Sequence, residues 1–195
     1  PFMPLFVEQL GARGHEVEYY AGLGISLSAI SAALLSPVWG SLADRYGRKP
    51  MMIRAATAMV FTMGGIAFVP NIFWLLLLRF LNGVFAGYVP NSTALIASQA
   101  PKEKTGYALG TLSTGVVAGN LMGPFIGGLI AEMFGIRNVF LLIGGFFLVA
   151  ALMTFYLIRE DFVPVTRQEE VGFRELLRQL RYPKMLMNLF LSSFV

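Results

Sequence analysis

The stretch GSLADRYGRKP, residues 40–50, decides the fold because it concentrates charge between two apolar runs. The run before it is YYAGLGISLSAISAALLSPVW, and the run after it is MMIRAATAMVFTMGGIAFVP. Each run is about 20 residues long, the length that crosses the hydrocarbon core of a bilayer as a helix. The stretch is therefore predicted to be a tight, charged turn between two membrane helices.

The composition of the whole chain indicates a polytopic membrane protein. Of its 195 residues, 56% are hydrophobic and 13% are charged, whereas soluble domains carry about 25% charged residues. The chain has no Cys and one His, His15, so a disulfide framework, a thiolate nucleophile and a His/Cys metal centre are not expected. We expect no cofactor, no metal and no nucleic-acid partner. No Ser–His–Asp cluster falls within the spans, so an enzyme is the least favoured class.

The expected spans cover most of the chain. Residues 1–7 are expected to end a first span, and five more are predicted at 19–42, 51–69, 72–98, 105–133 and 138–158. Both chain ends fall inside apolar segments, so we expect a fragment cut within helices one and seven. The predicted division is a transmembrane bundle over 1–158, a linker with an amphipathic helix over 159–183, and the start of a seventh span over 184–195.

Lys and Arg are distributed unequally between the two ends of the expected bundle. The end with the charged turn carries Arg45, Arg48, Lys49, Arg54, Lys102, Lys104, Arg159, Arg167, Arg174, Arg178, Arg181 and Lys184, and the other end carries Arg13 and Arg137. The positive-inside rule therefore predicts that the turn and the 159–183 linker are cytoplasmic.

The charged turn has the ordered pattern G-x-x-A-D-x-x-G-R-K. A solvated loop explains Arg45 and Lys49 but not the order of the pattern. The pattern resembles the signature loop between helices two and three of the major facilitator superfamily, matched at Gly40, Leu42, Ala43, Asp44, Arg45, Gly47, Arg48 and Lys49. The resemblance implies a gating latch in which the aspartate meets a helix N-terminus in the other half of the transporter. Gly40 is expected to let helix two approach a neighbour, and Gly47 is expected to supply the unusual backbone angle that a tight reversal needs. Glu103 is the acid expected to meet Arg48.

Arg79, in LLLLRFLNGVFAG, is expected to lie about 10 Å deep in the fourth span and to be the only Lys or Arg well inside any span. A charge at this depth favours a functional role over a purely structural one. The pattern L-x-x-x-R-x-x-N-G resembles the helix-four motif of the same superfamily, matched at Leu75, Arg79 and Gly83. The resemblance implies a part in proton transfer.

Helix five contains GVVAGNLMGPFIGG, with glycines four residues apart on one face. Generic small-residue packing is one reading of such a face. The pattern also resembles the motif typical of antiporters in the superfamily, at Gly115, Gly119, Gly123, Pro124, Gly127 and Gly128. The PFMP start resembles the proline pair that ends helix one in drug exporters.

Polar residues within the spans are candidates for a substrate cavity: Ser28, Ser31, Asn82, Tyr88, Asn91 and Asn120. Hydrogen bonding between helices is an equally good reading of them. None of the eleven acids falls at mid-span, and Glu8 and Glu132 are marginal candidates for the proton-carrying carboxylate.

Together the motifs resemble the N-terminal half of a twelve-helix drug:proton antiporter of the PmrA-like group of bacterial multidrug exporters. The resemblance implies an all-α membrane fold with two inverted three-helix repeats. It also implies efflux of small lipophilic, cationic drugs in exchange for protons across the bacterial cytoplasmic membrane, and hence antibiotic resistance. The partners implied are protons, membrane lipid and the C-terminal half. The alternatives are a facilitator or symporter for a metabolite such as a sugar, and a membrane scaffold that does not transport.

Overall fold

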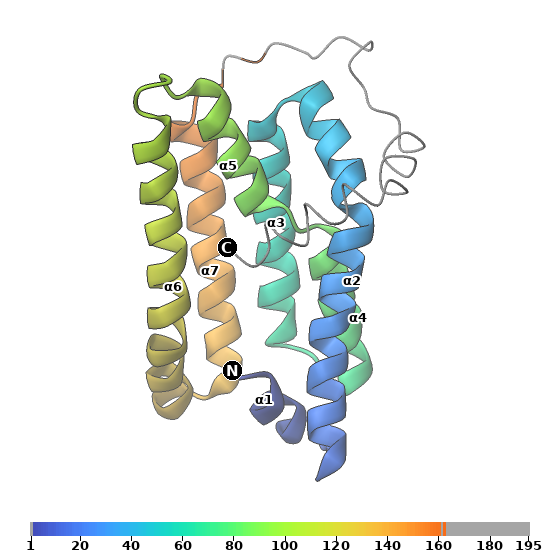
Figure 1. Ribbon diagram of the computed structural model, residues 1–195. Helices are drawn as coiled ribbons and strands as arrows, with labels where there is room; N and C mark the ends of the chain where they lie inside the picture. Colours follow the sequence, from blue (N-terminus) through green and yellow to red (C-terminus); the bar gives the residue numbers. More distant parts are fainter. Residues whose placement is uncertain (1, 161, 163–195) are drawn as a thin grey trace, which may run out of the picture. The chain divides into compact units, whose positions relative to one another are not determined.

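The computed structural model describes residues 2–160 and 162, all within the compact unit Pro1–Val163. These residues contain helices and no strand. In chain order the helices are α1 (Met3–Gln9), α2 (His15–Tyr46), α3 (Arg48–Ile66), α4 (Ile72–Val84), α5 (Tyr88–Gln99), α6 (Thr105–Phe134) and α7 (Ile136–Leu157) (Figure 1). The prediction of an all-helical membrane bundle is confirmed. Most of the predicted linker, 159–183, and the predicted start of a seventh span, 184–195, lie outside the described residues.

Four stretches in the described residues are long and apolar enough to cross a membrane, and each matches a predicted span. They are His15–Tyr46, Ile72–Gln99, Thr105–Phe134 and Ile136–Leu157. The 32 residues of α2 extend about 48 Å at 1.5 Å per residue, more than the hydrocarbon thickness. The 19-residue α3 is less apolar because Arg48, Lys49 and Arg54 lie in its first two turns.

The fourth span, predicted as continuous over 72–98, is broken in the structure. It forms α4 and α5, separated by residues 85–87. Gly87 has φ 130° and ψ 8°, outside the helical region. Pro90 follows in the first turn of α5, where it has no N–H to donate to the carbonyl four residues earlier. At the other end of the span, the Asn71 side chain accepts a hydrogen bond from the Trp74 N–H at 3.2 Å and so caps α4.

The helices pack in pairs. α2 lies against α4, and α3 lies against α7 and also contacts α4 and α5. α6 lies at one side of the bundle against α7 and α5, with α2 at the opposite side (Figure 1). The α3–α7 pair joins the third and sixth spans, which are the last helices of the two predicted three-helix repeats.

The two ends of the bundle carry different loops and helix ends (Figure 1). The turn end carries the α2–α3 turn, the α5–α6 loop and the end of α7, and the opposite end carries α1, the α3–α4 loop and the α6–α7 turn. The main hydrophobic core lies at the opposite end and includes Phe6, Val7, Leu75 and Phe140. The rings of Phe6 and Phe140 are 4.9 Å apart, so α1 is packed into the bundle by its aromatic side chain.

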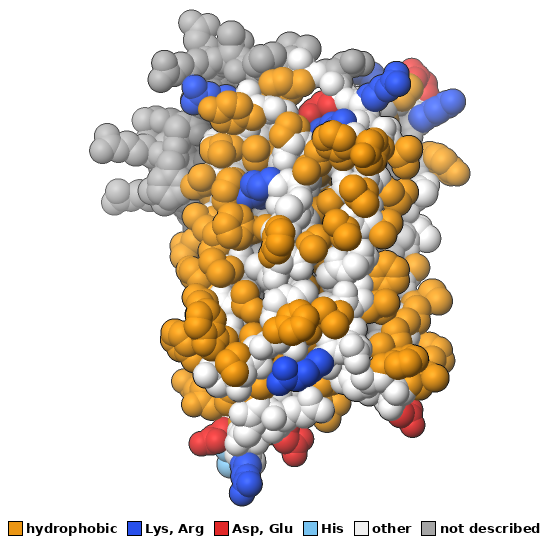
Figure 2. Space-filling view, turned by 180° about the vertical axis from the view of Figure 1, so that it is seen from behind, with side chains coloured by type: hydrophobic (Ala, Val, Ile, Leu, Met, Phe, Trp, Pro, Cys, Tyr) orange, Lys and Arg blue, Asp and Glu red, His pale blue; other side chains and the backbone are white. Residues whose placement is uncertain are grey.

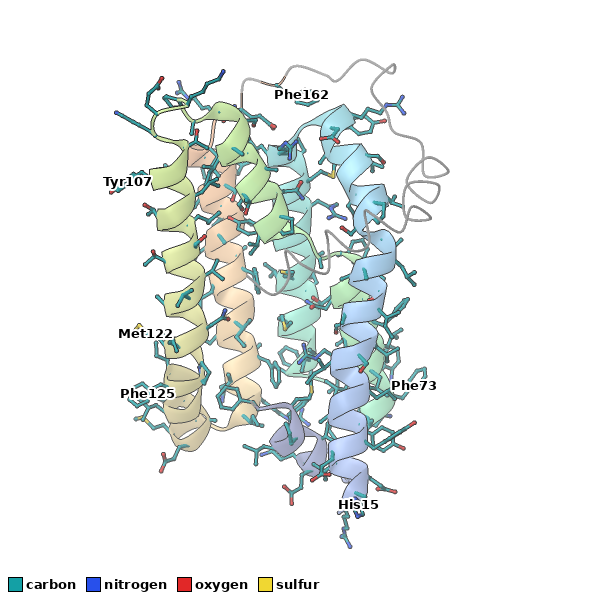
Figure 3. The ribbon with its side chains drawn as sticks, viewed as in Figure 1. His15, Phe73, Tyr107, Met122, Phe125 and Phe162 are labelled. Carbon is teal, nitrogen blue, oxygen red and sulfur yellow. The ribbon has the colours of Figure 1, made fainter. Side chains whose placement is uncertain are left out.

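The outer surface of the bundle is strongly apolar. Tyr107 is 82% exposed and Phe73 and Phe125 are each 69% exposed, and all three side chains point away from the helices (Figure 3). Figure 2 shows hydrophobic side chains along the height of one face, with charged side chains gathered mainly near the two ends. A surface of this kind is costly in water and suits contact with lipid chains.

Candidate functional site: the charged turn and the fourth span

The turn between α2 and α3 depends on Gly47, the single residue that separates the two helices. Gly47 has φ 99° and ψ 156°, a conformation that L side chains rarely adopt. A methyl group added there would lie 2.9 Å from Glu160 Oε2 and 3.4 Å from Phe162 Cδ2, which is labelled in Figure 3. Both the backbone angle and the available space therefore require glycine, as the pattern predicted for the angle.

Asp44 and Arg48 form an ion pair across this turn. Arg48 Nη2 lies 3.1 Å from Asp44 Oδ1, one helical turn apart in sequence, and the side chains are 29% and 50% exposed respectively. Arg45 lies beside its neighbour, 5.4 Å from the centre of the Tyr46 ring. About half of the Asp44 side-chain surface therefore stays exposed while Arg48 holds it.

Glu160, three residues after the end of α7, binds the N-terminus of α3. Its two carboxylate oxygens accept hydrogen bonds from the backbone N–H groups of Arg48 at 2.7 Å and Lys49 at 2.8 Å. The first N–H groups of a helix have no partner within the helix, and the helix dipole favours a negative charge there. The Lys49 ammonium also reaches α7, 5.8 Å from the centre of the Phe155 ring. The start of α3 is thus anchored to the end of α7.

The expected contact between Glu103 and Arg48 is not found in the described residues, where Arg48 pairs with Asp44. Glu103 is exposed in the α5–α6 loop. It was favoured because it lies closer to Arg48 in the sequence, whereas the packing of α3 on α7 brings Glu160 there instead. The signal for Glu160 was its position as the first acid after the last apolar span. We name Asp44, Gly47, Arg48, Lys49 and Glu160 the turn cluster.

Gly40 was expected to permit a close helix contact. A methyl group added at Gly40 would meet nothing within 4 Å among the described residues. Close approach of α2 occurs elsewhere, at Gly83 of α4, where an added methyl group would overlap both Ser31 Oγ and the Ser28 carbonyl oxygen.

Arg79 lies in α4 at the interface with α1 and α2. Its Nη2 is 3.9 Å from Met3 Sδ, and its carbonyl oxygen accepts a hydrogen bond from Ser28 Oγ at 2.7 Å. Arg79 Nε is buried and makes no hydrogen bond with the described residues. Buried guanidinium N–H groups ordinarily have an acceptor, so this position suits a carboxylate or water.

The candidate cavity residues on α2 and the first half of the fourth span make hydrogen bonds between helices. Ser31 Oγ is 3.1 Å from the Phe80 carbonyl oxygen of α4, and Ser28 bonds Arg79 as described. Asn82 Nδ2 donates to Thr62 Oγ1 of α3 at 3.2 Å, and both residues are buried.

The remaining candidates differ in their surroundings. The Tyr88 hydroxyl lies 2.9 Å from Thr154 Oγ1 of α7. Asn91 Nδ2 donates to the carbonyl of Gly87, the N-cap of its own helix, at 2.8 Å. Asn120 is exposed on α6. Four of the six candidates therefore bond a neighbouring helix, and contact with a substrate stays a prediction for all six.

The glycine face of α6 is mostly open in the described residues. Methyl groups added at Gly115, Gly119, Gly123 and Gly128 would meet nothing within 4 Å, and Pro124 lies inside the helix. A methyl group added at Gly127 would lie 2.6 Å from the ring of Phe2. The motif is therefore packed at Gly127, against the residue that precedes α1.

The two marginal acids lie near each other in space although they are far apart in the sequence. Glu8 and Glu132 both line an open pocket of about 520 Å³ at the opposite end, with Phe2, Leu5 and Gly128 among its walls. Both carboxylates belong to exposed residues. No cluster of three or more His, Cys, Asp or Glu that could hold a metal occurs in residues 2–160 and 162.

A second cation lies inside a span, which corrects the expectation that Arg79 is the only one. Arg54 was counted among the cations at the charged end, but it is the seventh residue of α3. Its guanidinium carbon is 3.5 Å from the centre of the Trp39 ring. Hydropathy alone does not place Arg54 inside the helix, because it is the fourth residue of the apolar run that follows the turn, MMIRAATAMVF.

Comparison with known proteins identifies the family and several relatives. The family model described as Major Facilitator Superfamily matches residues 1–195. The chain is 67% identical over 195 residues to the multi-drug resistance efflux pump PmrA of Streptococcus pneumoniae, covering 100% of this chain and 49% of the pump. It is 50% identical to the PmrA homolog of Lactococcus lactis, of which it covers 48%. It is 44% identical over 196 residues to the multidrug resistance protein MdtG of Salmonella paratyphi A, of which it also covers 48%. The chain thus spans about half the length of the curated relatives it matches.

Proposed function

The chain belongs to the major facilitator superfamily, and we propose that it acts as the N-terminal half of a proton-coupled exporter of lipophilic, cationic drugs. The observation that carries the proposal is the 67% identity to a multidrug efflux pump over all 195 residues. Export proceeds by alternating access, in which the two halves of such a transporter move against each other. Membership of a transporter family favours transport over catalysis.

We place the protein in the bacterial cytoplasmic membrane with the turn cluster inside. The support is the excess of Lys and Arg at the turn end, which the positive-inside rule assigns to the cytoplasm. In this arrangement residues 1–158 form the transmembrane bundle, while the cytoplasmic linker over 159–183 and the seventh helix from 184 stay predictions from the sequence. The remaining partners are membrane lipid and the C-terminal half.

The turn cluster acts as a gating latch. Asp44 is held by Arg48 at 3.1 Å, and its side chain is 50% exposed, so the N-terminus of a helix from the other half can bind it. Gly40 and Arg45 complete the surface that meets this helix. Glu160 fixes the start of α3, so the latch is held at a defined position relative to α7. A carboxylate at a helix N-terminus gains about 1 kcal/mol, enough to bias two states without locking either.

Arg79 takes part in proton coupling without carrying the proton itself. A guanidinium stays charged in essentially all protein settings, so its role is to stabilise an ionised carboxylate nearby. The buried and unbonded Arg79 Nε supports this role. The drug passes through a cavity lined by the six polar candidates, Ser28, Ser31, Asn82, Tyr88, Asn91 and Asn120. The glycine face of α6, Gly115 to Gly128, supports antiport by close helix packing.

The experiment that tests the proposal is efflux of a lipophilic cationic dye from cells that express the full-length transporter. We expect rapid dye loss when a proton gradient is present and slow loss after a protonophore collapses it. Cells with the empty vector are the control. Equal efflux with and without the gradient would identify a facilitator, and inward accumulation would identify a symporter. No movement of any tested dye would favour a scaffold. Each of these three results overturns the proposal.

A further inference from the structure

Among the described residues, three successive carbonyl groups at the break in the fourth span accept no backbone hydrogen bond. Val84, Phe85 and Ala86 precede Gly87, whose φ of 130° interrupts the helix. The carbonyl of Ala86 would require an N–H from Pro90, which has none. Backbone groups inside a membrane protein need partners because lipid offers none, so a break of this kind needs partners supplied by side chains.

Two side chains from neighbouring helices supply those partners. Trp39 Nε1 of α2 donates to the Val84 carbonyl at 2.6 Å. Arg54 Nη2 of α3 donates to the Ala86 carbonyl at 3.3 Å and, at the limit of hydrogen-bond distance, to the Phe85 carbonyl at 3.5 Å. Each of the three carbonyls therefore accepts a hydrogen bond from a side chain. The donors come from α2 and α3, so these two helices meet at the break.

The two donors also bind each other. The Arg54 guanidinium carbon lies 3.5 Å above the centre of the Trp39 ring, closer than most cation–π contacts, and the Trp39 ring is 6.2 Å from that of Phe85. Arg54 Nε and Nη1 are buried and make no hydrogen bond with the described residues. The indole face therefore stabilises the part of the guanidinium charge that the carbonyls do not.

We propose that Trp39 and Arg54 are positioning residues that clamp a built-in break in the fourth span and so set the place of Arg79 for transport. α4 carries Arg79 on one side of the break, and α5 carries Tyr88, bonded to α7, on the other. Both donors come from α2 and α3, the two helices that meet in the turn cluster. Movement of the turn cluster is thereby coupled to the angle between α4 and α5.

This inference rests on the proposed function only for its effect on transport, because the angle at the break is measurable in the purified protein. Spin labels at F73C and A97C report it, since Phe73 on α4 and Ala97 on α5 are both exposed and Phe73 points outward (Figure 3). The 195 residues contain no Cys, so only cysteines elsewhere in the full-length transporter need replacement. The protein is studied as the full chain in lipid nanodiscs.

Three variants test the clamp, and one controls it. Arg54→Gln removes the charge, Arg54→Lys keeps it without the planar fork, and Trp39→Phe keeps a ring but loses the Nε1 donor. Arg137→Gln is the matched control, because Arg137 donates to the carbonyls of Ala67 at 3.0 Å and Val69 at 3.3 Å, after the end of α3. It removes the same kind of contact at a different helix end.

We expect Arg54→Gln to broaden the distribution of distances between the labels and to add a second maximum, with a smaller change for Arg54→Lys and Trp39→Phe and none for Arg137→Gln. In the dye assay, Arg54→Gln should lower kcat by about tenfold while KM changes by less than about twofold, because the clamp positions α4 and does not bind substrate. Trp39→Phe preserves the bulk of the site and tests the clamp if Arg54→Gln fails to fold.

The outcomes separate this inference from the proposed function. Unchanged distances in all three variants overturn the clamp, even if transport is lost. A change in Arg137→Gln equal to that in Arg54→Gln also overturns it, because the effect is then general loosening of the bundle. If the unaltered transporter moves no dye while Arg54→Gln broadens the distances, the proposed function fails and the clamp stands.

Discussion

Glu160 accepts a hydrogen bond from the backbone N–H of Arg48 at 2.7 Å, although the two residues are 112 positions apart in the sequence. A second bond, to the N–H of Lys49 at 2.8 Å, makes the carboxylate a cap for α3 supplied by the end of α7. The same Arg48 uses its side chain to hold Asp44 at 3.1 Å. One residue therefore joins the end of the bundle's last described helix to the carboxylate of the turn.

Replacement of Glu160 by Ala should destabilise the protein and loosen the start of α3. Loss of two charge-assisted bonds at a helix N-terminus costs about 1–2 kcal/mol. Thermal unfolding in detergent measures this loss, and hydrogen exchange at the Arg48 and Lys49 amides should speed up. Glu103→Ala is the matched control, an exposed acid at the same end, and should change neither quantity. Equal effects of the two variants would contradict the capping role of Glu160.

Replacement of Asp44 by Asn should slow dye efflux by about tenfold or more while leaving membrane insertion intact. The substitution keeps the size of the side chain but removes the charge that Arg48 binds at 3.1 Å and that a helix N-terminus would attract. Efflux per molecule of protein in the membrane fraction is the measurement. Glu103→Gln neutralises another acid at the same end and should transport normally. Normal efflux by a well-inserted Asp44→Asn protein would remove the latch.

Replacement of Gly47 by Ala should lower the melting temperature. The φ of 99° costs a side chain about 1–2 kcal/mol, and the added methyl group would lie 2.9 Å from Glu160 Oε2. Gly22→Ala is the control, because Gly22 lies inside α2 and an added methyl group there meets nothing within 4 Å. The control should be neutral or stabilising by up to about 1 kcal/mol. A Gly47→Ala protein as stable as the Gly22→Ala protein would show that the turn tolerates a side chain.

Most of the fold could be predicted from the sequence because apolar runs of membrane length are strong, local signals. The predicted spans 19–42 and 105–133 correspond to α2 (His15–Tyr46) and α6 (Thr105–Phe134). The glycine at position 47 was also readable, since a reversal within a single residue needs a backbone angle that glycine adopts easily. These inferences depend only on residues close together in the chain.

The features that were missed depend on contacts between residues far apart in the chain. Glu160 could not be chosen over Glu103 without the packing of α3 on α7. The break in the fourth span has a local cause at Gly87 and Pro90, yet its stability depends on donors 45 and 32 residues away, Trp39 and Arg54. Hydropathy assigned Arg54 to the charged turn, because a sequence window does not distinguish a cation in the second turn of a helix from one in the loop before it.

Replacement of Arg79 tests the proposed proton coupling most directly. The guanidinium lies between α1, α2 and α4, with Nη2 3.9 Å from Met3 Sδ and with Nε buried and unbonded among the described residues. A guanidinium in this setting stabilises an ionised carboxylate, so its loss should favour the protonated form of that acid and shift the pH dependence of efflux upward. Arg79→Lys keeps the charge but loses the planar set of donors, and it should slow proton-driven efflux. Arg79→Ala should slow it further, because the acid then has no cation at all.

The measurement for Arg79 is the initial rate of dye efflux against external pH, with the amount of protein in the membrane held equal. The control is Arg137→Gln, which removes an arginine that binds carbonyl groups at the opposite end of the bundle and should leave the pH profile unchanged. A purely structural Arg79 would lower the amount of folded protein without moving the pH profile of the molecules that remain active. A normal rate and a normal pH profile in both Arg79 variants would therefore assign this arginine to packing alone. A pH profile that is shifted in Arg79→Ala and lies closer to that of the unaltered protein in Arg79→Lys requires a carboxylate partner within reach of the guanidinium.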